Sequence, residues 1–91
     1  MIKTYVERPS EVEAMMIAQF LNPRVLQAFV GDEFELIFDV DEEIDTLKSV
    51  TLRGPLWTKE LFLSDYVVRD EQERIFCYDA ESFHKNFMEK K

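Results

Sequence analysis

The sequence predicts a small α+β domain, in which a mainly antiparallel β-sheet packs against one short helix and a short C-terminal helix follows. Three observations support this fold class. Several short segments alternate apolar and polar residues, one segment has the start and stop signals of a helix, and the composition is that of a globular protein. Hydrophobic residues make up 46% of the 91 residues, and the chain has eight Phe but only two Gly and three Pro. This gives enough apolar material for a core, so we expect residues 1–91 to form a single domain.

The short helix is expected between Asn22 and Gly31. Asn22 can cap the first backbone amides, Pro23 suits the first helical position, and Gly31 suits the exit from the helix. The apolar residues of this segment recur at helical spacing; they are Val25, Leu26, Phe29 and Val30. They predict one apolar face on this helix.

Several strands are expected after the short helix. Within residues 34–40, Phe34, Leu36, Phe38 and Val40 alternate with Glu35, Ile37 and Asp39. Residues 49–53 also alternate and end at Gly54-Pro55. A third apolar segment covers residues 56–63. Residues 66–69 and 74–78 flank the polar sequence Asp70-Glu71-Gln72-Glu73, which predicts a hairpin.

Two segments remain to be assigned. The tail from Glu81 to Glu89 is expected to be a short helix that buries Phe83 and Phe87, with terminal lysines suited to its C-terminal dipole. Residues 10–21 are open between two interpretations. Ser10-Glu11-Val12-Glu13 is a capping-box pattern followed by good helix formers. However, Val12, Ala14, Met16 and Ala18 would also share one side of a strand.

This order of elements resembles the small phage and prophage proteins named for a Pro-Gly-Asp-Tyr-Gly motif, the PGDYG type. The matching positions are Tyr5 and Pro9, Val12-Glu13-Ala14, Thr51-Leu52-Arg53-Gly54, Asp65-Tyr66-Val67-Val68, and Phe83 with Phe87. Leu63-Ser64 replaces the Pro-Gly of the signature, which puts the turn geometry in question because Ser lacks the freedom of glycine at positive φ. The resemblance implies a phage origin, a mainly antiparallel sheet with one packed helix, and a strand at 12–18. It supplies no activity.

Charge and cysteine content limit the function classes. The net charge of -8 disfavours direct contact with nucleic acid or anionic lipid, since both need surplus Lys and Arg. Cys77 is the only cysteine, so a disulfide within the chain is excluded and a reducing cytoplasm is expected. The resemblance implies that this is the cytoplasm of a bacterial host cell. The residues after Met1 lack the apolar run of a signal peptide, and no segment is long enough to span a membrane.

The acidic residues concentrate between Asp32 and Asp45, with no Lys or Arg before Lys48. One interpretation is a solvated strand edge whose charges prevent pairing with other strands. The other is a negative surface that binds a basic groove, with carboxylates in place of nucleic-acid phosphates. For the second interpretation the candidate partner-binding residues are Glu33, Glu35, Asp39, Asp41, Glu42, Glu43 and Asp45.

The remaining candidates favour structural roles. A calcium loop starting at Asp39 would need Gly and Glu where Ile44 and Val50 stand, so no metal site is expected. His84 lacks a nucleophile beside it, and Cys77 lies in an apolar strand. Asp65 and Tyr66 suit a turn and the strand that follows it. We therefore expect no catalytic residues and no cofactor.

Trp57 is expected in the core or, with Phe62, in an apolar interface. Together these features predict a phage-derived binding protein that inhibits or modulates a host defence or nucleic-acid-processing protein with a basic surface. The alternative is a phage assembly domain that self-associates, including as a homodimer, through apolar surface.

Overall fold

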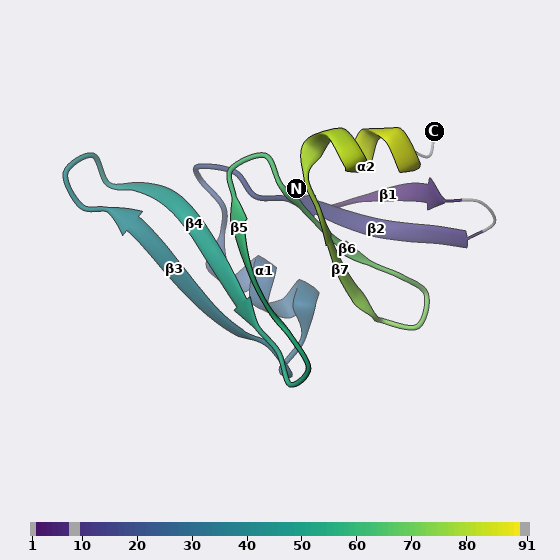
Figure 1. The fold of residues 1–91 in the computed structure, drawn as a ribbon, viewed down its shortest axis with the longest axis horizontal. Helices are drawn as coiled ribbons and strands as arrows, with labels where there is room; N and C mark the ends of the chain where they lie inside the picture. The colour runs from purple at the N-terminus through teal and green to yellow at the C-terminus, as the bar shows by residue number, and fades with distance from the viewer. Residues whose placement is uncertain (1, 8–9, 90–91) are drawn as a thin grey trace. The chain divides into compact units, whose positions relative to one another are not determined.

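The computed structural model describes residues 2–7 and 10–89, which form two antiparallel sheets and two helices (Figure 1). In chain order the elements are β1 (Ile2–Glu7), β2 (Ser10–Met16), α1 (Pro23–Val30), β3 (Glu35–Asp41), β4 (Thr46–Arg53), β5 (Thr58–Phe62), β6 (Tyr66–Arg69), β7 (Ile75–Tyr78), α2 (Ala80–Asn86) and β8 (Met88–Glu89). The predicted α+β class with a short C-terminal helix is confirmed. The chain divides into two compact units, one made of Met1–Met16 and Ser64–Lys91 and the other of Ile17–Leu63.

The first unit contains a five-stranded sheet with the order β7-β6-β2-β1-β8. Its central strand β2 pairs with β1 on one side and with β6 on the other, and β6 pairs with β7 as the predicted hairpin. The hairpin turn is closed by the Asp70 amide, which donates to the Arg74 carbonyl at 3.1 Å. The polar residues 70–73 therefore form the turn that their composition indicated.

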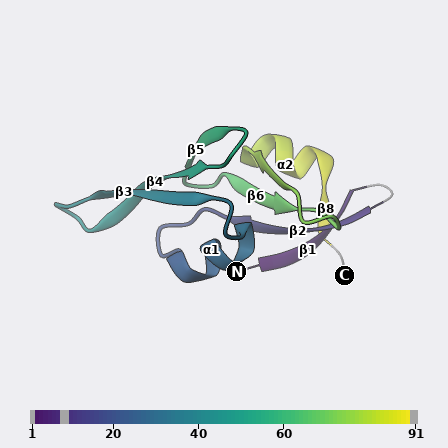
Figure 2. The ribbon, with the colours of Figure 1, turned by 90° about the horizontal axis from the view of Figure 1, so that it is seen from below.

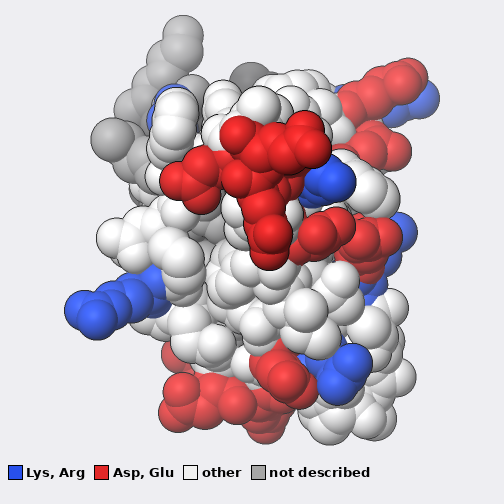
Figure 3. All heavy atoms as spheres, turned by 90° about the vertical axis from the view of Figure 1, so that its left-hand side faces the viewer, with Lys and Arg blue, Asp and Glu red and all other residues white. Residues whose placement is uncertain are grey.

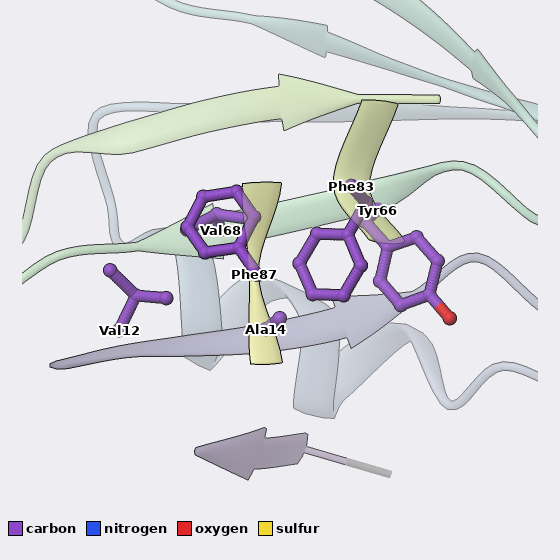
Figure 4. Packing of buried hydrophobic residues seen from close by; sticks show 6 residues of the cluster. All are labelled: Val12, Ala14, Tyr66, Val68, Phe83 and Phe87. Carbon is purple, nitrogen blue, oxygen red and sulfur yellow. The ribbon is translucent and has the colours of Figure 1, made fainter. Parts of the chain in front are cut away.

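One face of this sheet is covered by α2, and the two share a core of aromatic and aliphatic side chains (Figure 4). The ring of Phe83 stacks on that of Tyr66, with 3.9 Å between centroids, and the ring of Phe87 lies 5.0 Å from Phe83. Val12, Ala14 and Val68 complete the cluster from β2 and β6. Asp79 caps α2 by accepting a 2.7 Å hydrogen bond from the Ser82 amide, which fixes where the helix starts.

The second unit combines a three-stranded sheet, β3-β4-β5, with α1 (Figure 2). The Asn22 side chain accepts from the Arg24 amide at 2.9 Å, and Gly31 leaves the helix at a φ of 88°, as the cap signals predicted. The Gln27 amide group then donates to the carbonyls of Gly31 and Phe34 and fixes the connection to β3. The buried side chains of this unit are Ile17, Leu26, Phe29, Val30, Ser49, Val50, Leu52 and Leu61.

The segment left open, residues 10–21, is a strand only as far as Met16. Helix propensity is overridden because β2 gains hydrogen-bonded partners on both edges, β1 and β6. Val12 and Ala14 point to the same face and are buried, while Glu13 on the other face pairs with Arg69 at 2.7 Å. The alternation required by the strand interpretation therefore holds for Val12 and Ala14, but it ends there, because Met15 is buried, Met16 is exposed and Ala18 lies after the strand.

Three further details differ from the sequence-based picture. The strands form two sheets rather than one, and within residues 56–63 only Thr58–Phe62 is a strand. The tail helix ends at Asn86, where Phe87 turns to extended backbone, so the expected helix to Glu89 is too long. Pro9 and the terminal lysines Lys90 and Lys91 lie outside the described residues. Neither helix of the described chain has the length and apolar character needed to cross a bilayer.

Candidate partner-binding hairpin

The β3–β4 hairpin extends beyond the third strand of its sheet. β5 pairs only with Ser49–Arg53, so among the described residues no third strand of this sheet pairs with the part of the hairpin from Val40 to Lys48 (Figure 1). The register shifts between Asp39 and Val40, which pair with Ser49 and Leu47, and this leaves Lys48 as the extra residue of a bulge. A bulge bends and twists the strands that carry it. The tip of the hairpin is thereby set apart from the regular sheet.

The turn at the tip depends on two of the acidic residues themselves. The backbone amide of Glu43 donates a hydrogen bond to the Asp41 carboxylate at 3.0 Å. The Asp41 side chain thereby stabilises the turn. Asp45 has a φ of 53°, in the left-handed region that Asp tolerates better than most residues. Asp41 and Asp45 are therefore suited to the turn as well as charged.

The distal hairpin, residues 40–48 together with the adjacent Asp39, carries a concentration of negative charge at one end of its unit. Glu42, Glu43 and Asp45 are exposed in the turn, Asp41 ends β3, and Asp39 is exposed two residues before it. Figure 3 faces this end of the hairpin and shows a group of acidic side chains at the tip. Within the described chain, none of these carboxylates lies within 4.0 Å of a Lys or Arg nitrogen. The charge at the tip is thus not offset by ion pairs there.

The other two acidic candidates lie at the opposite end of β3. Glu33 belongs to the turn before the strand, and Glu35 is the first residue of β3. Glu35 lies directly across from Arg53 and forms an ion pair with it at 3.5 Å. At about 3.3 Å per residue, Glu35 is roughly 20 Å from Asp41 along the strand. The seven candidates therefore form two groups, and only the five from Asp39 to Asp45 share the tip.

Exposed apolar side chains accompany the acidic tip. Ile44, between Glu43 and Asp45 in the turn, is 67% exposed, and Val40 is 41% exposed. Neither residue was among the candidates predicted from sequence. For Ile44 a signal was present, because an aliphatic side chain is unusual within a four-residue turn that is otherwise acidic. The tip therefore offers apolar contact together with its charge.

Trp57 immediately precedes β5, and Phe62 is the last residue of that strand. Trp57 is 37% exposed, and its ring contacts Phe34, with 5.0 Å between centroids. Phe34 in turn fills the space beside Gly54, where a Cβ atom would come within 2.5 Å of the Phe34 ring. Phe62 is 55% exposed and lies in one cross-strand row with Ser49 and Asp39. Phe62 is thus closer in the sheet to the acidic hairpin than to Trp57.

His84 and Cys77, the two residues that were considered as a catalytic base and a nucleophile, belong to the five-stranded unit. His84 is exposed, and its Nε2 is 3.4 Å from the Tyr66 hydroxyl, while Cys77 is half-buried in β7. In the described part of the chain, no group of three or more His, Cys, Asp or Glu is arranged to hold a metal ion. The arrangement around His84 is an aromatic cluster with a hydroxyl at its edge.

Comparison with known proteins returned no matching family model, no matching curated protein and no matching solved structure.

Proposed function

We propose that this protein binds a basic surface of another protein through the distal β3–β4 hairpin, and that the bound partner handles nucleic acid. The observation that supports this most directly is the concentration of five carboxylates at the tip of that hairpin, from Asp39 to Asp45, none of which forms an ion pair with another described residue. The resemblance to PGDYG-type phage proteins extends the proposal. The protein would act in the bacterial cytoplasm as a phage-encoded inhibitor or modulator of a host defence or nucleic-acid-processing factor.

The physical basis is the similarity of carboxylates and phosphates as acceptors. Both accept charge-assisted hydrogen bonds from Arg and Lys, so a row of carboxylates can occupy a groove that normally holds a nucleic-acid backbone. Like charges held close together at the tip repel one another, and a cationic groove relieves that repulsion. The exposed side chain of Ile44 adds an apolar contact at the centre of the charged turn. Long-range attraction would mainly raise the association rate.

The test is a tagged pull-down from bacterial lysate with the wild-type protein and a neutralised hairpin, Asp41→Asn with Glu42→Gln and Glu43→Gln. The Asn side-chain oxygen can still accept from the Glu43 amide, so the turn is kept while the charge is removed. We expect the wild type to retain a nucleic-acid-binding protein at low salt and to lose it at high salt. Duplex nucleic acid should displace that protein, and the neutralised hairpin should not retain it.

The matched control carries the same change in net charge elsewhere: Asp32→Asn, Glu73→Gln and Glu81→Gln, all at exposed positions. This control should bind the partner nearly as well as the wild type. A partner whose affinity survives both high salt and the neutralised hairpin would show that the acidic tip is not the binding surface. Light scattering on the purified protein separates the assembly alternative, because a salt-insensitive homodimer would favour self-association through apolar surface.

A further inference from the structure

The face of the five-stranded sheet that α2 covers is not covered completely. α2 has seven residues and ends at Asn86, so its last aromatic contact with the sheet is made by Phe87 just after the helix. Beyond Phe87 lies a cavity of about 260 Å³, which belongs entirely to this unit. Val12, Val68 and Phe87 provide its buried apolar lining, Phe76 and Tyr78 provide aromatic rings from β7, and the β6–β7 turn forms its polar side.

The turn beside this cavity is fixed by hydrogen bonds before any ligand arrives. The Asp70 carboxylate accepts from the backbone amides of Gln72 and Arg74, at 2.9 and 2.8 Å, and from the Arg74 Nε at 2.7 Å. The guanidinium of Arg74 also donates to the Gln72 side chain at 3.2 Å and lies 5.9 Å from the centre of the Phe76 ring. The polar side of the cavity is therefore preorganised, which reduces the entropy lost on binding.

The charges of the turn favour a cation over an anion. Arg74 and Asp70 offset each other in a 2.7 Å ion pair, and the exposed carboxylate of Glu71, which also lines the cavity, is left as the excess charge. The aromatic lining already accommodates one cation, since the Arg74 guanidinium lies over the Phe76 ring, and the rings of Tyr78 and Phe87 meet edge to face at 5.2 Å beside it. The volume of the cavity is smaller than the roughly 300 Å³ of the smallest pockets that bind drug-sized ligands. It is therefore suited to a group about as large as one side chain.

We propose that this cavity binds a primary alkylammonium group, with the alkyl chain against the aromatic and aliphatic lining and the ammonium at Glu71. The source that we assign to it is a lysine side chain of a polypeptide. This proposal goes beyond the function proposed above and does not depend on it, because the cavity and the acidic hairpin belong to different units. Either can fail while the other holds.

The test is an amide chemical-shift titration of the full chain with three probes that share an alkyl chain and differ in charge: butylammonium, butanol and pentanoate. Shifts should be localised to the amides of residues 12, 68, 70–78 and 87 and should be largest for butylammonium. We expect its affinity to exceed that of butanol by about two- to fivefold, the range for an exposed cation beside aromatic rings, and pentanoate to bind least. A capped Gly-Lys-Gly peptide should bind with an affinity equal to or higher than that of butylammonium. A lower affinity of the peptide would show that the site binds free amines and not a lysine side chain.

Glu71→Gln should lower the butylammonium affinity about two- to fivefold and leave the butanol affinity unchanged. The matched control is Glu73→Gln, which removes an exposed carboxylate of the same turn. Glu73 does not line the cavity, so this variant should change neither the butylammonium affinity nor the butanol affinity. Equal binding of butylammonium and butanol, strongest binding of pentanoate, or no localised shifts would each overturn the proposal. The neutralised hairpin used above should bind butylammonium normally, so this result is separate from the pull-down.

Discussion

Ser64 occupies a backbone conformation that costs free energy, and replacing it with glycine should stabilise the protein. Its φ is 77°, in the left-handed region, and it precedes Asp65 and the start of β6. The side chain is exposed, and within the described chain its hydroxyl has no hydrogen-bond partner. The substitution Ser64→Gly therefore removes strain without removing a contact.

The magnitude follows from two opposing terms. An L-residue in the left-handed region costs about 1–2 kcal/mol, whereas glycine loses about 0.5–1 kcal/mol more conformational entropy on folding. The net gain expected for Ser64→Gly is about 0.5–1 kcal/mol in the free energy of unfolding. For a domain of this size that corresponds to a rise in Tm of about 2 to 8 °C. Thermal unfolding followed by circular dichroism, with urea denaturation as a second measure, would resolve it.

Two control variants separate backbone strain from other effects. Ser64→Ala keeps a Cβ atom in the same conformation and should leave Tm nearly unchanged. Gly31→Ala adds a Cβ atom at a φ of 88°, with no other atom within 4 Å of it, so it should lower the free energy of unfolding by about 1 kcal/mol through strain alone. The reasoning is refuted if Ser64→Gly lowers Tm, or if Ser64→Ala raises it by as much as glycine does.

Two further predictions concern packing and titration. Gly54→Ala should lower the free energy of unfolding by about 1–3 kcal/mol, because the added Cβ atom would lie 2.5 Å from the Phe34 ring. The double variant with Phe34→Leu should recover part of that loss, as measured by urea denaturation. Equal stability of Gly54→Ala and the wild type would contradict the contact. Burial alone would raise the pKa of Asp70, but the hydrogen bonds and the positive charge of Arg74, with the Gln72 amide, lower it below the ordinary value of 3.8. A lowered pKa stabilises the fold above the unfolded-state value, and that contribution is lost as the pH falls below about 4 towards the folded-state pKa. Asp70→Asn should therefore cost about 1 kcal/mol at neutral pH, and its difference from wild type in urea denaturation should shrink below pH 4; a constant difference at all pH values would show that the carboxylate charge is not responsible.

Local signals in the sequence were sufficient to predict the elements whose structure depends on residues close together in the sequence. The helix that became α1 was predicted from Asn22, Pro23 and Gly31, and each performs the expected capping role. The β6–β7 hairpin likewise follows from a polar turn between two apolar segments. Strand pairing was not predictable in this way, because the partner of a strand is distant in sequence. The pairing of β2 with both β1 and β6 settled residues 10–16 as strand, and nothing within that segment could show it.

The candidate site was predicted in part for the same reason. Acidic composition identified Asp39 to Asp45, but it could not show that Glu35 is paired with Arg53 across the sheet. Nor could it show that Trp57 contacts Phe34 while Phe62 lies in a row with Asp39. These relations come from register and from the bulge at Asp39, which determine the side chains that become neighbours. Whether the acidic tip binds a partner stays a prediction.

The absence of β5 pairing beyond Ser49 has a consequence for how the hairpin exchanges its amide hydrogens. Two strands without a third neighbour are marginally stable in water, so we expect the end from Val40 to Lys48 to open in local events without unfolding of the three-stranded region. Its amides would then exchange with solvent faster than those of Val50 and Leu52. A protein that binds this end of the hairpin would also stabilise its closed, hydrogen-bonded form. Slower amide hydrogen exchange confined to these residues would therefore identify them as the binding surface for that protein.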